Sequence, residues 1–458
     1  MFPLLKTRRV PGAAWVRRQL IADRLPATLL AAAVAGVLGA LATVAFREAL
    51  EWLQAWLGGA PAHGMVSLAR GLAWWERLLL PASGGAVAGL VLHWANTRLP
   101  KRGAGDYMEA IALGRGIVGM RQTLARSLAS LVFISSGASI GREGPMVQLA
   151  AMLSSALGRF LVLPPGHLRL LVACGATAGI TAAYNAPIAG ALFVSEIVYG
   201  AVSSATLVPL VVSSVAANMV TRQLLNYDAV YHMPAFDFVS GWEVLSYLGL
   251  GLLAGVTAPY YLALLDAARR GFVRLARPLW LRLALGGLVV GVISLGWPEV
   301  WGNGYSVVNS MLHQPWAWQA VAILLLMKMV ATAGSVGSGA VGGIFTPTLF
   351  VGAAVGHLYG AALHGLLPAG SVSSVSSYAV VGMGALLAAA THAPLMSILM
   401  IFEMTLSYEA MLPLMLACVT GFVIARGLRA DSMYSRSLAR NRRMQALLGA
   451  RLPKGRED

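Results

Sequence analysis

Apolar residues fill almost the whole length of this chain, and that feature decides what it can fold into. Of its 458 residues, 58% are hydrophobic and only 11% are charged, whereas a soluble domain carries roughly 25% charged residues. So few charges cannot give a bundle of this size a water-facing surface. We therefore predict an integral membrane protein.

Many apolar segments are interrupted by Gly, Pro or a polar pair before they reach the roughly 20 residues that a complete helical crossing needs. Irregular backbone inside a membrane is tolerated only where protein or a water-filled cavity surrounds it. The pattern therefore predicts an all-α polytopic membrane protein in which some helices are tilted, broken or re-entrant.

The net charge of +16 is concentrated in three places. Basic residues collect in KTRRVPGAAWVRRQ near the start, in DAARRGFVRLARPLWLR near the middle, and in the C-terminal tail. Because basic loops stay on the cytoplasmic side of a membrane, both termini and the central loop are predicted to be cytoplasmic. A nucleic-acid-binding arm is the competing interpretation. The hydrophobic bundle beside these runs disfavours it, and we expect no nucleic-acid partner.

Charge and hydropathy divide the chain into three parts. We predict a basic cytoplasmic segment at 1–27, a single transmembrane domain at 28–430, and a short basic tail at 431–458 with no appended regulatory domain. The basic start lacks the short apolar core and cleavage site of a removable signal peptide. Cys174 and Cys418 lie in separate apolar segments and are expected to be buried core residues rather than a disulfide.

The transmembrane domain contains an internal repeat. SGASIGREGPMVQLAA from Ser136 matches SGAVGGIFTPTLFVGA from Ser338, an offset of 202 residues. GATAGITAAYNAPIAGALFVSE from Gly175 matches GMGALLAAATHAPLMSILMIFE from Gly382, an offset of 207 residues. Two multi-residue matches in the same order predict a duplicated domain.

We place the two repeats at about 28–225 and about 240–430. Such repeats, often inverted, are typical of transporters, whose substrate site lies at the repeat interface among interrupted helices. The interrupted segments are therefore where a functional site is expected.

The matched breaks GREGP and GGIFTP have the pattern of helix starts. Glycine lets the chain turn tightly, and proline in the first turn lacks an amide that would have no partner there. The free amides of a helix start carry the positive end of the helix dipole and bind anions. A third break, KRGAGDYMEA at 101–110, adds more amides. Three converging helix starts predict a small-anion site without a fully charged ligand, which lets the ion bind and still leave.

Glu143 lies within the first break and is a candidate gate. A carboxylate tethered at a helix start can occupy the anion site, and it must be protonated or displaced before a mobile anion takes that place. The alternatives are a first-turn glutamate favoured by the helix dipole, or an ion pair with Arg142. Because ionisable groups inside a membrane are costly and usually functional, we favour the gate.

GREGP, GGIFTP, the NAP and HAP segments that each precede a glutamate, and the late MYS resemble the CLC family of chloride channels and proton-coupled chloride exchangers. WGNGYS and GDYMEA are similar to its bacterial ClcB-type branch. The resemblance runs from about Leu30 to Tyr434. It implies a homodimer with one pore per subunit, each an inverted repeat, in a bacterial inner membrane. The implied substrate is chloride or a related small anion.

Carried over by position, the resemblance assigns Glu143 as the external gate. Backbone amides or side chains that contact the anion are expected at Gly103, Ala104, Gly105, Arg142, Gly144, Ile344, Phe345 and Tyr434.

Two departures from the family pattern bear on mechanism. The serine with which relatives coordinate the anion has no counterpart in GAGDY. Exchangers of the family commonly have two adjacent glutamates after NAP, the second a proton station, and here the pair reads Glu196-Ile197. Glu196 is a candidate proton relay, although its recurrence as Glu403 in the other repeat favours a shared structural role. We therefore favour a passive chloride channel over a proton-coupled exchanger, while Glu143 keeps protonation in play.

Two other polar residues each allow two interpretations. Tyr434 is expected to donate its hydroxyl to an inner anion, or else to anchor the chain at the membrane interface. Lys328 is expected to attract anions, or else to be a structural lysine that extends its amine toward the interface or packs between helices.

A remote alternative is an intramembrane serine hydrolase, with Ser338 as nucleophile and His392 as base. Ser338 lies in no nucleophile motif, and His392 matches Asn185 of the other repeat, which indicates a turn. No metal-ligand cluster, phosphate loop or nucleotide motif is present in the sequence. We therefore expect neither an enzyme nor a metal or cofactor.

Overall fold

The structure is a computed structural model, and it describes residues 18–20, 25–58, 64–100, 103–225, 231, 243–276, 278–368 and 370–435. Most of the two terminal segments predicted at 1–27 and 431–458 lies outside these residues. Within the described ranges every element is a helix, apart from two isolated β-bridges.

The described helices follow one another in two halves. The first half contains α2 (Leu25–Gly58), α3 (Met65–Gly71), α4 (Trp74–Arg98), α5 (Tyr107–Ala112), α6 (Met120–Ser135), α7 (Glu143–Phe160), α8 (Pro165–Tyr184), α9 (Pro187–Leu192), the π-helix η1 (Phe193–Tyr199) and α10 (Ser204–Leu224). The second half contains α11 (Glu243–Leu275), α12 (Leu279–Ser294), the 3-10 turn η2 (Pro298–Val300), α13 (Tyr305–His313), α14 (Trp318–Gly337), α15 (Phe345–Leu366), α16 (Val375–Thr391), α17 (Pro394–Thr405) and α18 (Met411–Leu428).

Seven of the described helices are long and apolar enough to cross a membrane, namely α2, α4, α10, α11, α14, α15 and α18. At about 1.5 Å per residue, the 34 residues of α2 exceed a hydrocarbon core of about 30 Å, so α2 either tilts or extends beyond it. The apolar helices α12, α16 and α17 are shorter. This mixture of long and short helices is what the interrupted apolar runs predict.

The outer face of the bundle is apolar. Only 33% to 56% of the apolar windows of the seven long helices is buried. Trp74 and Trp75, at the start of α4, are 66% and 51% exposed, as expected for residues at a membrane interface. Both cysteines are buried and free.

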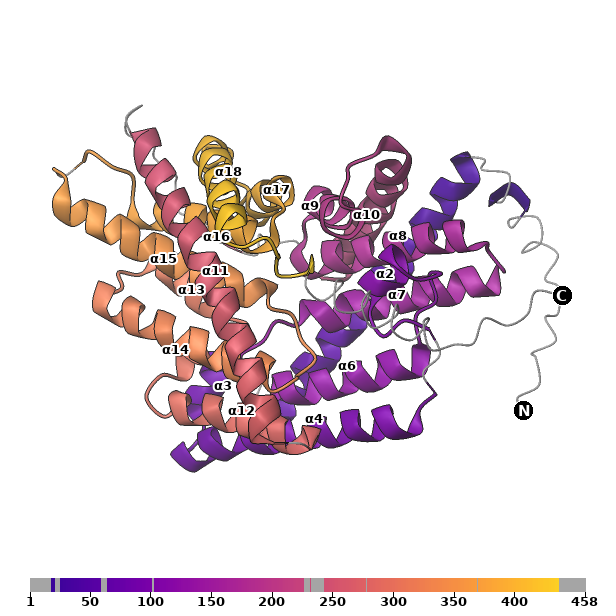
Figure 1. Cartoon of the computed structure of the whole chain (residues 1–458), viewed down its shortest axis with the longest axis horizontal. Helices are drawn as coiled ribbons and strands as arrows, with labels where there is room; N and C mark the ends of the chain where they lie inside the picture. Colours follow the sequence, from indigo (N-terminus) through magenta and orange to yellow (C-terminus); the bar gives the residue numbers. More distant parts are fainter. Residues whose placement is uncertain are drawn as a thin grey trace.

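The second half, drawn in pink through orange to yellow, packs against the first, drawn in indigo to magenta, and α4 runs alongside α12 (Figure 1). Helices α4 and α12 cross closely, because Gly287 leaves room for the Pro81 carbonyl where a Cβ would overlap it. Small residues permit such close helix contacts in membrane proteins. Within the halves, α7 packs on α8 as α15 packs on α16.

The two matched breaks meet inside the molecule. Gly141 N donates to Gly343 O at 2.7 Å, and Gly343 N donates to Gly141 O at 2.8 Å. Helix α7 begins two residues after the first glycine and α15 begins two residues after the second. The paired backbone therefore sets the starts of α7 and α15 next to each other.

Asn185 and His392, the residues matched at the second repeat position, also have matching conformations. Both are left-handed, with φ of 55° and 59°, and each ends one helix shortly before the Ala-Pro step that opens the next. His392 therefore has the turn position that the repeat predicts.

Candidate anion-binding site

A cavity of about 410 Å³ lies against the starts of α7 and α15. Its wall includes six of the residues predicted to act on the anion, namely Gly105, Glu143, Gly144, Ile344, Phe345 and Tyr434. These residues come from the segment before α5, from the starts of α7 and α15, and from the segment after α18. The structure thus brings together residues that lie as far apart in the sequence as 105 and 434.

The Glu143 carboxylate, on the first residue of α7, lies against the start of α15. Oε1 accepts from Thr346 N and Oε2 accepts from Thr346 Oγ1, both at 3.2 Å. The side chain is buried, with 7% exposed. A carboxylate in this place accepts the hydrogen bonds that a bound anion would otherwise accept.

Gly141 and Gly343 leave the space that this carboxylate fills. A Cβ on either residue would overlap the Glu143 carboxyl group. The glycines of GREGP and GGIFTP therefore do more than allow a turn. They let an acidic side chain lie between the two paired breaks.

The amides that precede Thr346 are the open donors of this helix start. No acceptor for the amides of Ile344 and Phe345 lies among the described residues. Such amides at a helix start carry partial positive charge and suit a small anion. The start of α15 therefore leaves the amides of Ile344 and Phe345 free for an anion, while the Thr346 amide already donates to Glu143.

Arg142 does not line this cavity. It lies on a separate hollow of about 170 Å³ together with Asn303, Tyr305 and Ser306. Its guanidinium carbon is 6.0 Å from the centre of the Tyr305 ring. No salt bridge joins Arg142 to Glu143 in the part of the chain described. The two hollows therefore approach each other at the peptide between Arg142 and Glu143.

Lys328 stabilises the wall of the smaller hollow. It is fully buried, and its Nζ donates to Val300 O at 2.9 Å and to Gly302 O at 2.8 Å. The amine also lies 5.3 Å from the centre of the Phe350 ring. Lys328 therefore neither lines the larger cavity nor extends to the membrane interface.

Tyr434 lines the larger cavity, and its ring packs edge-on against Phe193 with centroids 5.5 Å apart. No hydrogen-bond partner of its hydroxyl lies among the residues described. A phenol has an ordinary pKa near 10, so the hydroxyl is a donor at neutral pH. The geometry favours an anion contact over an interfacial anchor.

The third break differs from the expectation. Helix α5 has only six residues, and side chains already take its first amides: Tyr107 N donates to Gln148 Oε1 at 2.9 Å, and Met108 N donates to Asp106 Oδ1 at 3.1 Å. The α5 amides are therefore not free for an anion.

The residues before α5 also lie differently from their predicted positions. Ala104 N donates to Ile117 O at 2.8 Å in a parallel bridge, and neither Gly103 nor Ala104 lines the cavity. Gly105 does line it, but its carbonyl accepts from Arg126 Nη1 at 2.6 Å. The segment before α5 and the start of α5 thus offer the cavity no free amide of the kind predicted for the third break.

Asp106 was missed as a site residue, although it lies on the cavity wall. The pattern Asp106-Tyr-Met-Glu109 is a helix-start signal, because an acidic residue followed three positions later by glutamate commonly caps a helix. That signal could have shifted the expected contact from Gly103 and Ala104 to Asp106. The cavity wall therefore contains charged groups that the sequence prediction did not name, Asp106 together with Arg126 and Arg269.

Glu196 and Glu403 each cap a helix in the other half of the chain. Glu196 accepts from Leu395 N at 3.4 Å and from Met396 N at 2.8 Å, at the start of α17. Glu403 accepts from Ile188 N at 2.9 Å and from Ala189 N at 2.7 Å, at the start of α9. These reciprocal caps satisfy amides that a helix start leaves without partners.

Neither member of the Glu196-Ile197 pair lines the larger cavity. Ile197 lies in η1 and packs against the hydrophobic core. The structure therefore does not bring this pair to the wall that carries Glu143.

The proposed hydrolase pair is not assembled. Ser338 Oγ donates to the carbonyl oxygen of Ser335 at 2.7 Å, and the His392 ring lies edge-on to Phe422 with centroids 6.0 Å apart. No contact between the two residues occurs in the described part of the chain.

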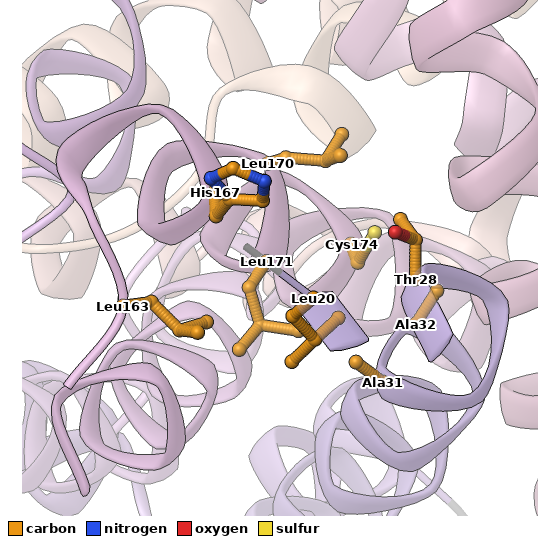
Figure 2. A pocket seen from close by; sticks show the side chains of 9 residues that line it. All are labelled: Leu20, Thr28, Ala31, Ala32, Leu163, His167, Leu170, Leu171 and Cys174. Carbon is orange, nitrogen blue, oxygen red and sulfur yellow. The ribbon is translucent and has the colours of Figure 1, made fainter. Parts of the chain in front are cut away.

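A third hollow, of about 20 Å³, lies between the starts of α2 and α8. Figure 2 shows Leu20, Leu171 and Cys174 around it, with the His167 ring among the lining side chains. A space of this size holds about one water molecule. It shares no lining residue with the larger cavity.

Residues 84–426 match the family model described as voltage gated chloride channel. Over 418 residues the chain is 63% identical to a ClcB-like chloride channel protein of Ralstonia nicotianae, covering 90% of this chain and 97% of that one. Over 420 residues it is 43% identical to the voltage-gated ClC-type chloride channel ClcB of Escherichia coli O81, covering 90% and 99%.

Solved structures share the fold. A slow cyanobacterial Cl⁻/H⁺ antiporter matches with a TM-score of 0.79 at 24% identity, covering 90% of this chain and 97% of that one. A CLC-type fluoride/proton antiporter matches with a TM-score of 0.74 at 21% identity, covering 88% and 96%.

Proposed function

Since the chain belongs to the CLC family of voltage-gated chloride channels and related chloride transporters, we propose that it moves chloride through a pore gated by Glu143. As a member of this family it is a multi-pass membrane transport protein with the CLC fold, and not an enzyme. One observation carries the gate: the Glu143 carboxylate accepts two hydrogen bonds from Thr346 at the start of α15. Chloride can use that helix start fully only after this carboxylate is protonated or displaced.

The proposed anion site combines backbone and side-chain donors. The amides of Ile344 and Phe345 supply the helix start, Tyr434 supplies a hydroxyl, and Gly144 lets the backbone of α7 approach. Arg142, on the smaller hollow, attracts anions toward the gate from its other side. Gly103 and Ala104 have no part in this site as proposed, and Gly105 contributes to the wall only.

We favour passive conduction as the transport mode. Glu196 is engaged in capping α17, and Ile197 has no ionisable group. A proton travelling toward Glu143 by that route would lack a stopping point, and an isolated charge in a dry interior is very costly.

Proton-coupled exchange is the second candidate, and one observation favours it. The cavity beside Glu143 has a volume of about 410 Å³, which is room for many water molecules. A proton on this path would not have to cross dry protein. The names of the two solved relatives, both proton antiporters, suggest the same mode.

We also propose an inverted-repeat homodimer in a bacterial inner membrane, with both termini and the central basic loop in the cytoplasm. The pairing of Gly141 with Gly343 and the reciprocal caps support the repeat. Val211, Val215 and Met219 of α10 form an exposed apolar row suited to lipid or a second subunit.

Chloride efflux from proteoliposomes tests the gate, with equal pH on both sides of the membrane. Wild-type flux should rise as pH falls, because protonation releases the Glu143 carboxylate from Thr346. Glu143→Gln should raise the flux at neutral pH and remove most of this rise. Glu409→Gln, on the exposed turn before α18, is the matched control and should behave as wild type. A Glu143→Gln protein with the full wild-type pH response would refute the gate.

A further inference from the structure

Asp106 is an acidic group on the wall of the larger cavity that the proposed gate does not use. Its side chain is half-buried, and Oδ1 accepts from Met108 N at 3.1 Å. The carboxylate also accepts from the Tyr107 amide, which it shares with Gln148. A carboxylate held by two backbone amides therefore shares a wall with Glu143 and Tyr434.

The charged and titratable groups around this cavity come from several elements. They are Arg126 of α6, Glu143 of α7, Arg269 of α11, and the phenols of Tyr107, Tyr184 and Tyr434. Arg126 acts on Asp106 across space, while its Nη1 donates to the Gly105 carbonyl at 2.6 Å. No salt bridge between Arg126 and Asp106 is present in the described part of the chain.

Helix capping alone does not account for a carboxylate here. Asn and Ser cap helix starts about as well as Asp, and Gln148 already holds the neighbouring amide of Tyr107. A charged group inside a membrane protein is costly compared with these neutral caps. The charge of Asp106 therefore calls for a role that a neutral cap would not fill.

We propose that Asp106 sets the affinity of this cavity for anions. Ionised, it repels an anion in the cavity; protonated, it no longer does so. Two unit charges about 10 Å apart at an effective dielectric constant near 20 repel enough to change a binding constant about tenfold. The inference rests on the proposed function, because it requires anions to occupy the cavity.

A consequence is a second source of pH dependence beside the gate. Chloride affinity should increase as pH falls through the titration of Asp106, even in a protein whose residue 143 cannot titrate. Glu143→Gln provides that background, and it also leaves Asp106 as the acidic residue on the described cavity wall.

The test is calorimetric titration of chloride into purified protein between pH 4.5 and 7.5. Four proteins are compared: Glu143→Gln alone, and the same protein carrying Asp106→Asn, Asp106→Ser or Asp431→Asn. Asn and Ser both retain a cap for α5, so either one keeps the test valid if the other fails to fold. Asp431 is exposed after the end of α18 and does not line the cavity, and its change removes an equal charge.

Glu143→Gln alone should bind chloride more weakly at pH 7.5 than at pH 4.5. Asp106→Asn and Asp106→Ser should bind chloride about tenfold more tightly at pH 7.5 and should lose the pH dependence. Asp431→Asn should keep it. Chloride binding that persists in both Asp106 variants with unchanged affinity and pH dependence would overturn the role of Asp106 alone. Absence of chloride binding in Glu143→Gln itself would overturn the proposed function and this inference together.

Discussion

At the scale of single residues, the account depends on one carboxylate and on the space that two glycines leave for it. Glu143 reaches Thr346 because Gly141 and Gly343 carry no Cβ. A side chain added at either glycine should therefore displace the Glu143 carboxylate from Thr346 and alter the gate, as substitution of Glu143 itself does.

Gly343→Ala should displace the gate without removing its charge. The new Cβ would overlap the Glu143 carboxyl group, so the carboxylate should leave Thr346. We expect chloride flux at neutral pH to rise several-fold and its pH dependence to shrink, measured as efflux from proteoliposomes. Gly365→Ala, in the last turn of α15 with open space around its Cβ position, should change neither. Wild-type pH dependence in a folded Gly343→Ala protein would contradict the proposed contact.

Tyr434→Phe tests the inner donor. Loss of a hydrogen bond to a charged group costs about 1.5 to 3 kcal/mol, so chloride affinity measured by calorimetry should fall about tenfold or more. The ring contact with Phe193 remains possible for phenylalanine, so the fold should be retained. An unchanged affinity would favour the interfacial-anchor interpretation.

Sequence patterns predicted the positions of single residues well where the signal was local. Gly and Pro in GREGP and GGIFTP correctly indicated the starts of α7 and α15. The Glu143 contact with the opposite helix could not be predicted in this way, because it depends on the pairing of Gly141 with Gly343 across about 200 residues of chain. Asp106 was missed because the glycines of the third break received more weight than its capping pattern.

At the scale of elements, the starts of α9 and α17 are each capped by a glutamate from the other half of the chain. Each begins at an Ala-Pro step and receives its capping carboxylate from the other half, through Glu403 and Glu196. The sequence showed that these glutamates recur, and a shared structural role was the favoured interpretation. The sequence could not show that each glutamate caps a helix in the other half of the chain, because one sequence does not show which helices face each other.

Glu403→Ala should destabilise the protein by about 2 kcal/mol or more, because two amides at the start of α9 lose a charged acceptor. The measurement is thermal unfolding in detergent, where the midpoint should fall. Glu403→Gln should have a smaller effect, since its amide oxygen can still accept, and Glu409→Ala, at an exposed turn, should have almost none. Equal midpoints for Glu403→Ala and Glu409→Ala would show that the cap contributes little.

At the scale of the whole molecule, two hollows lie among the long helices and the shorter interrupted ones, one lined by Glu143 and the other by Arg142. The hydropathy pattern predicted the membrane bundle, because the burial of apolar surface dominates that choice. It could not predict the two hollows, whose walls are assembled from residues spread over both repeats.

Passive conduction predicts that chloride movement carries no protons. In liposomes with an outward chloride gradient, no proton gradient and a clamped membrane voltage, internal pH should stay constant while chloride leaves. Sustained chloride-driven proton uptake would instead support the exchanger. Glu196→Gln would then distinguish a relay through that side chain from a relay through water in the cavity.

Bromide located by anomalous X-ray scattering gives the most direct test of the central claim, that the Glu143 carboxylate occupies a place where an anion binds. Crystals of the wild type and of Glu143→Gln, grown at neutral pH with bromide in place of chloride, should differ at the start of α15. The account predicts a bromide peak within hydrogen-bonding distance of the Thr346 amide in Glu143→Gln and no peak at that amide in the wild type, where Glu143 accepts from it. Equal bromide occupancy in both proteins, or bromide absent from that helix start in both, would contradict it.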